Sequence, residues 1–396
     1  MRRSSALTSS SIVLTLLSVG CEVHLHPIYL VDDGGGQTQI PATCPNDLIG
    51  YATLSDAVTI TDAGTDAAPT LIMDGGTRGG GPLDGGDVVT VNASDDGALD
   101  AFTMYAGDKT AGPLVIQLNG MLTIPPPAAD ADADSGQEIR VSSDKTVIGV
   151  GASSGLIGGG LALTKVSNVV IRNLVIKQPN TAGVIDAIHV ETSDHIWIDH
   201  CDLSSGDKTG AAATYDGLVD ITDGSDFVTI SWTHYHDHKD TGIIGRSDSS
   251  SAAMEDDGKE HVTYDHDFFE NVVAGPRIRF GTVHVLNCYF NQVSLYGVAS
   301  TESANVRIEK SYFENVVPPG QDVGADYGPI TSFLSDSDLP GYVDLVGNLS
   351  ASSGANQIAG SQMDMWMPPY PFSGATDSAM SVPTIVAACA VTGKVN

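Results

Sequence analysis

The chain has 396 residues, and its 49 acidic side chains outnumber 18 basic ones, so its formal net charge at pH 7 is −31. A surface this acidic repels nucleic acid and anionic membranes, which excludes DNA or RNA as the expected partner. Five cysteines are also too few for a scaffold built on disulfides in a chain of this length.

The first 20 residues are predicted to be an export signal. Arg2 and Arg3 form a basic start, an apolar core runs from Ile12 to Val19, and a small-residue cleavage point precedes Cys21. The Ser-Val-Gly-Cys sequence there resembles a bacterial lipoprotein signal, with ordinary secretion as the alternative. No later stretch supplies the roughly twenty apolar residues of a transmembrane helix. We therefore expect a protein that is secreted or held at the outer cell surface by lipid on Cys21.

Residues 21–43 contain acidic and glycine runs with little periodicity, so we expect a flexible tether there. Beyond this tether, one repeat covers most of the chain. Residues 44–396 are therefore expected to form a single elongated domain.

The repeat is a short phrase in which apolar and polar residues alternate. Its copies begin at Val169, Ile196, Val228, Val262, Val283, Val306 and Val343. Successive starts are therefore 27, 32, 34, 21, 23 and 37 residues apart. Alternation over three or four residues is the period of a β-strand, and a strand that returns at such intervals is typical of a solenoid.

The fold class predicted from this repeat is all-β, as a right-handed parallel β-helix. A β-sandwich would show turn signals every eight to twelve residues. A doubly wound α/β fold would need helices between the strands, but the sequence shows no sustained helical period. The intervals are rich in Gly, Asp, Ser and Thr, which suit long surface turns. We expect each phrase to supply one strand of a rung, and long loops of unequal length to project from one side of the solenoid.

The cysteines of this domain fall into two kinds. Cys44 and Cys389 flank its two ends and could pair in an oxidising compartment. Cys201 and Cys288 lie within strand phrases and are expected to be buried, unreactive thiols.

Three carboxylates are candidate metal ligands. Asp186 precedes the phrase at Ile196, and Asp216 and Asp220 lie four residues apart before the next phrase. Equivalent positions on neighbouring rungs lie about 4.8 Å apart, so Asp186 can face the Asp216/Asp220 pair. Carboxylates this close repel one another unless a cation joins them, and hard oxygen ligands suit Ca²⁺. The alternative is that all three are ordinary exposed turn residues.

Other polar groups are expected to be structural. The acidic pair Asp256-Asp257 and the run at residues 130–134 are expected to be solvated loops. Four histidines could suggest zinc or copper, but hydrogen-bonded structural roles are the favoured interpretation. These histidines are His200, His236, His238 and His266.

The order of these phrases resembles the pectate lyases of polysaccharide lyase family one, over roughly residues 48–395. The matching stretches include KTVIGVG from Lys145, DAIHVETSDHIWIDHC from Asp186, YDGLVDI, VTISWTHYHDH from Val228 and PRIRFGTVHVLN from Pro276. The resemblance implies a Ca²⁺-binding groove on a β-helix and cleavage of α-1,4-linked polygalacturonate by β-elimination. It also implies that the metal ligands are Asp186, Asp216 and Asp220.

Two positions depart from the pattern of this family. Its members carry an Arg ahead of the PRxR phrase, written R-x-P-R-x-R, and that Arg is the proposed general base. Ala274 occupies this position here. The lysine of the family's DH-x-K phrase, which pairs with the substrate carboxylate, corresponds to Asp240 in an ungapped alignment. The last Arg of the phrase is kept as Arg279.

Arg279, Arg277 and Lys239 are therefore the candidate catalytic residues. Arg277 and Arg279 are two residues apart and would point to the same face of a strand. Arg277 could then approach the C5 proton of a uronate, although a free Arg is nearly always protonated. Lys239 could reach the lysine position through a one-residue bulge. The alternative for each is a simple salt bridge on an acidic surface.

The sequence thus predicts a monomeric, calcium-dependent lyase that acts on an acidic plant-type polysaccharide. A cation on the uronate carboxylate would stabilise the charge that develops when C5 loses its proton. The alternatives are a non-catalytic relative that binds calcium and polygalacturonate, a lyase for methylated pectin, and a hydrolase with paired carboxylates. An unsaturated product that absorbs ultraviolet light would distinguish the two lyases from the others.

Overall fold

The computed structural model describes residues 41, 43–54, 76–80, 87–126, 138–179, 186–206, 216–321, 324, 327–335, 338–359 and 367–395. These residues belong to one compact unit, Thr38–Asn396. The expected signal segment, nearly all of the expected tether and the acidic run at 130–134 lie outside the described residues. Within the described part, no helix is long and apolar enough to cross a lipid bilayer.

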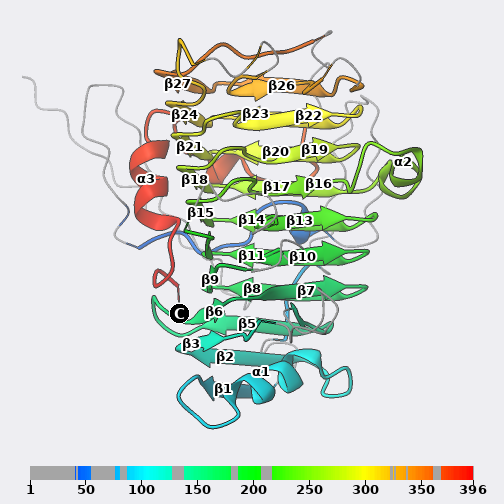
Figure 1. The fold of residues 1–396 in the computed structure, drawn as a ribbon, viewed down its shortest axis with the longest axis vertical. Coiled ribbons are helices and arrows are strands. Elements are labelled where there is room, and N and C mark those ends of the chain that lie inside the picture. Colours follow the sequence, from blue (N-terminus) through cyan, green and yellow to red (C-terminus); the bar gives the residue numbers. More distant parts are fainter. Residues whose placement is uncertain are drawn as a thin grey trace, which may run out of the picture. The chain divides into compact units, whose positions relative to one another are not determined.

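The described residues wind through three parallel sheets of ten, nine and eight strands, and each complete turn adds one strand to each sheet (Figure 1). The first sheet contains β1 (Asp87–Asn92), β2 (Leu114–Asn119), β5 (Lys145–Gly149), β8 (Ser167–Arg172), β11 (Asp194–Asp199), β14 (Asp226–Ser231), β17 (His261–Asp265), β20 (Thr282–Leu286), β23 (Asn305–Glu309) and β26 (Tyr342–Val346).

The second sheet contains β3 (Met121–Thr123), β6 (Gly155–Ile157), β9 (Val175–Lys177), β12 (Asp202–Ser204), β15 (His234–His236), β18 (Phe268–Glu270), β21 (Tyr289–Asn291), β24 (Tyr312–Glu314) and β27 (Leu349–Ala351). The third sheet contains β4 (Glu138–Arg140), β7 (Gly160–Thr164), β10 (Ile188–Glu191), β13 (Val219–Thr222), β16 (Ile243–Ile244), β19 (Arg277–Arg279), β22 (Val298–Thr301) and β25 (Ile330–Thr331). The predicted right-handed parallel β-helix is thereby confirmed.

The register of the first sheet reproduces the spacing of the sequence phrases. Val169 pairs with Ile196, Ile196 with Val228, and Val228 with Val262. The later copies continue the same ladder to Val343. Every step of the predicted repeat is therefore one complete turn of the solenoid.

Each phrase supplies two strands, one more than the sequence pattern predicted. A strand of the first sheet and a strand of the second are joined by two residues. In six phrases the first of the two lies in the left-handed region, with φ between 49° and 58°. These corner residues are Asn173, His200, Trp232, His266, Asn287 and Lys310. Because one left-handed residue turns the chain between sheets, the apolar alternation continues almost without interruption, and these six corners have no glycine or proline signal. In the seventh phrase the corner is a glycine, Gly347, with φ of 64°.

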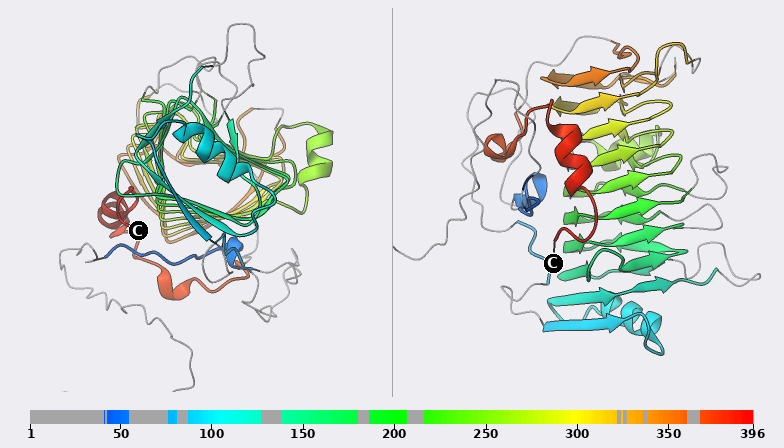
Figure 2. Two further views of the ribbon diagram at one scale, coloured as in Figure 1. Left: turned by 90° about the horizontal axis from the view of Figure 1, so that it is seen from below. Right: turned by 90° about the vertical axis from the view of Figure 1, so that its left-hand side faces the viewer.

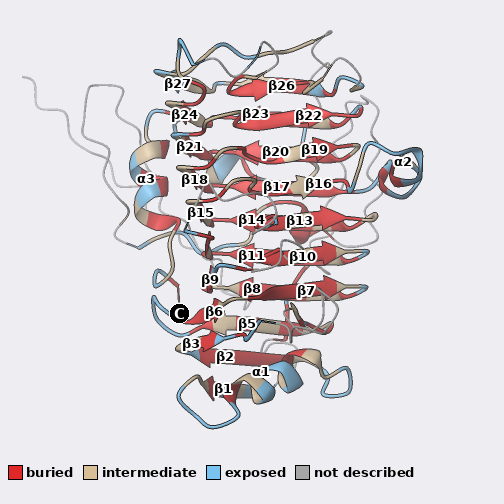
Figure 3. Ribbon diagram, viewed as in Figure 1, coloured by how far each residue is buried: buried red, intermediate tan, exposed pale blue. Residues whose placement is uncertain are grey.

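The core is built from inward side chains that stack from rung to rung. The rings of Phe269 and Phe290 have centroids 4.6 Å apart, and those of Phe290 and Phe313 are 4.7 Å apart, in both cases nearly parallel. All three side chains are buried, as is most of the strand surface (Figure 3). This spacing follows the strand separation of about 4.8 Å, so one apolar position per turn extends the core.

In the part of the chain that the structure describes, three α-helices lie outside the sheets. The helix α1 (Ala98–Gly107) contacts β1, β2, β3 and β4 and covers that end of the solenoid (Figure 2). Its Phe102 is fully buried in the core. The helix α2 (Ser250–Asp256) lies in the connection between β16 and β17. A short 3-10 helix, η1 (Tyr51–Thr53), packs on β11, β14 and β17, and a second, η3 (Ser373–Ala375), lies in the C-terminal segment.

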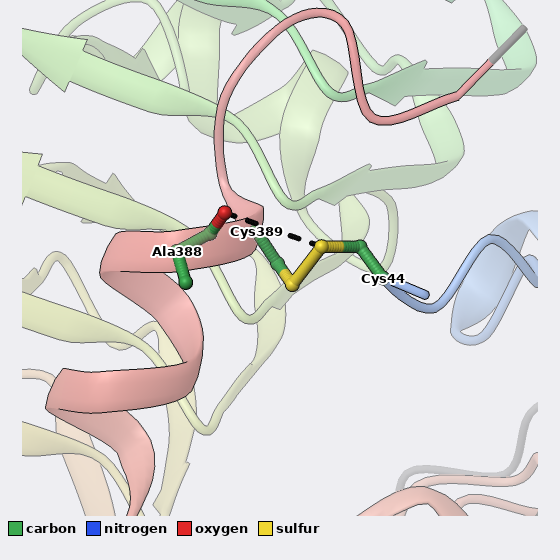
Figure 4. The surroundings of a disulfide bond; sticks show 3 residues. All are labelled: Cys44, Ala388 and Cys389. Carbon is green, nitrogen blue, oxygen red and sulfur yellow. Dashed lines mark hydrogen bonds between the residues drawn. A yellow bond between two sulfur atoms is a disulfide. The ribbon is translucent and has the colours of Figure 1, made fainter. Parts of the chain in front are cut away.

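The helix α3 (Val382–Cys389) packs on the outer face of the second sheet, against Phe268 and Tyr289. A disulfide bond joins Cys44 to Cys389 at the end of this helix (Figure 4). The pairing that the sequence left open is therefore present. Cys201 and Cys288 are buried free thiols, as expected.

One acidic residue that was expected to be solvated is buried. Asp256 ends α2 with its side chain covered, and its Oδ1 accepts a hydrogen bond from the Gly224 N–H at 2.9 Å. The neighbouring carboxyl group of Glu260 is also buried, and Asp226 adds further negative charge. The expectation failed for Asp256 because the helix turns this carboxylate inward, whereas Asp257 is exposed.

This buried acidic pair predicts a pH dependence of stability. Burial, together with the Asp256 carboxylate, raises the pKa of Glu260 from 4.5 to about 10. Between these values the folded state holds a proton that the unfolded chain releases, so rising pH lowers stability, by at most about 1.4 kcal/mol per pH unit. We expect Glu260→Gln to flatten the loss of unfolding free energy between about pH 6 and about pH 9, measured by urea denaturation. The exposed variant Asp257→Asn should keep the wild-type slope, and equal slopes in all three proteins would contradict the assignment.

Candidate metal and substrate site

The outward face of the third sheet brings candidate residues into two parallel columns. In the first, the pairing of Ile188 with Val219, extended two residues back, places Asp186 beside Gly217. Further along the same column, Ala274 forms parallel bridges with Asp240 on one side and Tyr296 on the other. The metal candidate Asp186 and both departures from the family pattern therefore follow one line across successive rungs.

The second column contains Asp220 and Arg277. Asp220 pairs with His189 on one side, and the Ile221–Ile244 pair places Ile243 on its other side. Ile243 pairs in turn with Arg277. Arg277 is thus two rungs from Asp220, about 10 Å along the sheet at the usual strand spacing.

Two of the three candidate carboxylates converge on a glycine. Asp186 Oδ1 accepts a hydrogen bond from the Gly217 N–H at 2.8 Å. A Cβ atom at Gly217 would lie 2.9 Å from this oxygen and 2.4 Å from Asp220 Oδ1. Any side chain there would displace the carboxylates, so glycine keeps open a small cradle between them. Sequence reasoning missed Gly217, although its place between Asp216 and Asp220 was the available signal.

The electrostatics of this cluster show an excess of negative charge. Partial burial and the charge of Asp186 raise the pKa of Asp216 to about 6. Burial and the charges of Asp186 and Asp216 raise the pKa of Asp220 well above its ordinary value. The hydrogen bond from His189 Nδ1 to Asp186 Oδ2, at 3.2 Å, raises the pKa of His189 to about 9. One imidazolium therefore faces three carboxylates, and a divalent cation would relieve the remaining repulsion.

The carboxylate oxygens of Asp186, Asp216 and Asp220 lie further apart than the ligand atoms of a compact three-residue metal site. Among the described residues, groups of three whose ligand atoms all lie within 4.8 Å of one another occur elsewhere, at Asp202–His234–His236 and at Asp248–Glu302–Asp338. The donors of the trio are nevertheless all carboxylate oxygens, with space at Gly217. These features fit Ca²⁺, which accepts irregular oxygen coordination completed by water.

Arg277 and Arg279 point to the same face, as their spacing predicted, and both bind Asp248. The Nη2 atom of Arg277 lies 3.0 and 3.2 Å from the two Asp248 oxygens and 3.4 Å from Asp338 Oδ2. The Nε atom of Arg279 lies 2.5 Å from Asp248 Oδ1, and its Nη1 donates to the Gly245 carbonyl at 3.0 Å. Burial raises the pKa of Asp248, but the two guanidinium groups outweigh it and lower that pKa overall. Asp248 therefore acts as a clamp on both arginines, and sequence reasoning missed it.

The two positions that depart from the family are adjacent in space. Ala274 is fully buried in an apolar cluster with Tyr296 and Ala299. Ala274 bridges directly to Asp240, so Asp240 occupies the column and Lys239 does not. The bulge that would have brought Lys239 into the column is absent at this bridge. The Nζ atom of Lys239 nevertheless lies 3.1 Å from Asp240 Oδ2, so the ammonium group reaches this edge of the column.

All four candidate histidines are held by protein partners. His200 Nδ1 lies 2.8 Å from Asp199 Oδ2. His238 contacts Ser205 Oγ at 2.9 Å and the Asp216 carbonyl at 2.7 Å, and so fixes the segment that carries this metal candidate. His266 lies between Asp265 and Asp377. The fourth, His236, belongs to a different cluster on the second sheet.

The comparisons with known proteins agree with this architecture. A family model described as pectate lyase matches residues 42–388. A probable pectate lyase B of Aspergillus terreus is 36% identical over 314 residues, which are 79% of this chain and 85% of that protein. A pectate trisaccharide-lyase of Bacillus licheniformis is 32% identical over 329 residues, 82% of this chain and 85% of that protein. A crystal structure of a pectate lyase from Bacillus sp. N165 in complex with trigalacturonate has a TM-score of 0.67 at 25% identity, covering 88% of this chain and 100% of that one.

Proposed function

Because the chain belongs to the pectate lyase family, we propose that it cleaves pectate, α-1,4-linked polygalacturonate, by β-elimination. The observation that carries this function is the match to named pectate lyases over 85% of their length. The enzyme is accordingly a carbon–oxygen lyase that acts on a polysaccharide. Nothing in the comparisons favours the non-catalytic alternative.

The proposed cofactor is Ca²⁺, held by Asp186, Asp216 and Asp220. When bound, the ion would supply positive charge against the uronate carboxylate and so acidify the C5 proton. Gly217 keeps the space between two of these carboxylates open, and His238 fixes the backbone of the third. An anionic polymer could then approach a strongly acidic protein, because the cation offsets the local negative charge.

Arg277 is proposed to bind a substrate carboxylate. It would replace the family's lysine, whose position is occupied by Asp240 in this chain. It lies in the same column as Asp220, and its contacts with Asp248 and Asp338 hold a charged guanidinium group at that face. A charged guanidinium binds carboxylates in a bidentate manner, which suits a uronate. Arg279, which is more deeply buried, would position Arg277 through their shared partner Asp248.

Lys239 is the proposed proton acceptor. In the elimination, C5 loses its proton, the C4–O bond breaks, a C4–C5 double bond forms and the leaving oxygen takes up a proton. The amine of Lys239 lies at the edge of the column that contains Ala274, the position of the family's base. A lysine can supply a neutral amine more readily than an arginine can. A shift of the ascending limb of the pH–rate profile to higher pH in Lys239→Arg would support this role, because a general base must lose its own proton before it can accept one.

The decisive assay follows the unsaturated product by its ultraviolet absorbance. The purified protein is incubated with polygalacturonate in excess calcium and then with a chelator. A calcium-dependent rise is expected. New reducing ends without absorbance would instead indicate a hydrolase, and calcium-dependent binding without any product would indicate a non-catalytic relative.

We further propose that the protein is exported and works as a monomer, anchored by lipid on Cys21. The basic start, apolar core and cysteine of the first 21 residues support this location. Labelled palmitate should enter the wild-type protein in a bacterial host, but not the Cys21→Ser variant. Release of unlabelled wild-type protein into the medium would instead indicate ordinary secretion.

Restoring the family's arginine at position 274 is expected to damage the fold before it helps catalysis. Ala274 is fully buried beneath Tyr296, so an arginine must displace that ring or bury its own charge. Overpacking of this kind costs about 1–3 kcal/mol, so we expect Ala274→Arg to lower the melting temperature. The smaller change Ala274→Ser should be tolerated. An Ala274→Arg protein with full stability and raised activity would show that the position still serves as the base site.

A further inference from the structure

A cluster of two histidines and one aspartate lies on the outer face of the second sheet, separate from the proposed calcium site. His234 and His236 belong to the single strand β15, and their spacing of two residues puts both side chains on one face. Asp202 of β12 pairs in register with His234. One ligand atom from each of the three residues lies within 4.8 Å of the other two.

The carboxylate of Asp202 contacts one nitrogen of each imidazole ring. Its Oδ1 is 3.3 Å from His236 Nε2, and its Oδ2 is 3.7 Å from His234 Nδ1. All three side chains are partly covered, with 12% exposure for His234, 20% for His236 and 21% for Asp202. They are thus open enough for an ion to enter, yet sheltered from bulk solvent.

The outer nitrogen of each imidazole has a carboxylate of its own. His234 Nε2 lies 3.2 Å from Glu270 Oε2, and His236 Nδ1 lies 2.9 Å from Asp237 Oδ2. Asn271 donates a hydrogen bond to the other oxygen of Asp237. Histidines that bind a metal through one nitrogen usually donate the other N–H to a carboxylate in this way, which fixes the tautomer and strengthens the ligand. This outer set of partners is an observation independent of the three inner atoms.

Stacking holds the rings in this arrangement. The His234 and His236 centroids are 4.4 Å apart, and His234 also stacks on Phe268 at 4.7 Å with an interplanar angle of 9°. Phe268 is itself packed beneath α3. The imidazoles are therefore positioned by the packed face of the sheet before any ion arrives.

From this geometry, we propose that His234, His236 and Asp202 form a site for a divalent transition-metal ion of the zinc type. Two imidazole nitrogens and one carboxylate are the donors of three-ligand zinc sites, which leave a further position for water. Glu270 and Asp237 serve as the outer partners of the two histidines. The chemistry differs from the all-oxygen calcium cluster, since imidazole favours zinc and its neighbours over calcium.

The site lies close along the chain to the proposed calcium ligands. Two residues after His236, His238 contacts the carbonyl of Asp216. An ion that ties β12 to β15 would therefore stiffen the segment that leads to the calcium cluster. Its function would be structural support of the groove, and its binding does not depend on the proposed lyase activity.

The test measures zinc binding to the full purified chain with excess calcium present, so that oxygen sites are already filled. Zinc content after dialysis, the visible spectrum of the Co²⁺ form and the zinc-dependent rise in melting temperature are the readouts. We expect one tightly bound ion per chain and a Co²⁺ spectrum typical of nitrogen and oxygen ligands. His236→Gln and Asp202→Asn should each weaken zinc binding by about 100-fold or more, and Glu270→Gln by about 10- to 100-fold.

Two controls separate zinc binding at this cluster from zinc binding elsewhere on the chain. Another His-x-His sequence lies far along the chain at His24 and His26, and the double variant His24→Gln/His26→Gln should bind zinc as the wild type does. Asp186→Asn should lose calcium dependence but keep zinc, which separates the two proposals. No saturable zinc binding by the wild type, or unchanged binding by folded His236→Gln and Asp202→Asn, would overturn the site and leave a simple network of ion pairs.

Discussion

Replacing Asp220 by Asn should lower kcat/KM on polygalacturonate by about 10²- to 10³-fold, the range seen when one preorganised electrostatic group is removed from an active site. The carboxylate of Asp220 reaches the Gly217 cradle beside Asp186, so the substitution removes one of the two acidic groups that converge there. The amide keeps the volume of the side chain but carries no charge. Initial rates at several calcium concentrations provide the measurement.

The same variant should not be less stable without calcium. Burial and the charges of Asp186 and Asp216 raise the pKa of Asp220, so removing its charge relieves repulsion in the empty cluster. Calcium should then raise the melting temperature of the wild type but have little effect on Asp220→Asn. The exposed variant Asp96→Asn near α1 should resemble the wild type in both respects. Full activity of Asp220→Asn would remove this residue from the proposed metal site.

The solenoid could be predicted from the sequence because its geometry is periodic. The intervals between phrases equal the steps of the ladder from Val169 to Val343, since each turn must return the chain to the same register. The insertions of variable length leave the phrase itself unchanged. Neighbouring rungs also bring equivalent positions together, and for this reason Asp186 and Asp220 could be placed near each other from sequence spacing alone.

The clamp on the arginines could not be predicted in the same way. Asp248 lies just before α2, outside any phrase, and its contacts with Arg277 and Arg279 span 29 and 31 residues. A loop residue has no period that indicates its partner. Asp202 and His234 lie at matching phrase positions, and His236 follows two residues later. Placing His234 and His236 on one face from the sequence requires the strand boundary to be known. The left-handed corner at Trp232 hid that boundary.

The last expected result separates the roles of the two arginines. Arg277→Ala should lower kcat/KM by about 10²-fold with calcium binding and stability nearly intact, because this guanidinium lies in the Asp220 column. Arg279→Ala should instead cost about 1.5–3 kcal/mol of stability, since its charged hydrogen bonds to Asp248 and to the buried Gly245 carbonyl are lost.

The conservative variants sharpen this distinction. Arg277→Lys keeps the charge but loses the bidentate geometry, so it should recover only part of the activity and mainly through KM. Asp248→Asn should lower both the activity and the stability, because it weakens the hold on both guanidinium groups at once. If Arg279→Ala lost activity at unchanged stability while Arg277→Ala remained active, Arg279 would be the substrate-binding arginine and Arg277 the supporting one. The more buried arginine would then face the substrate, and the groove would follow the neighbouring column through Thr222 and Gly245.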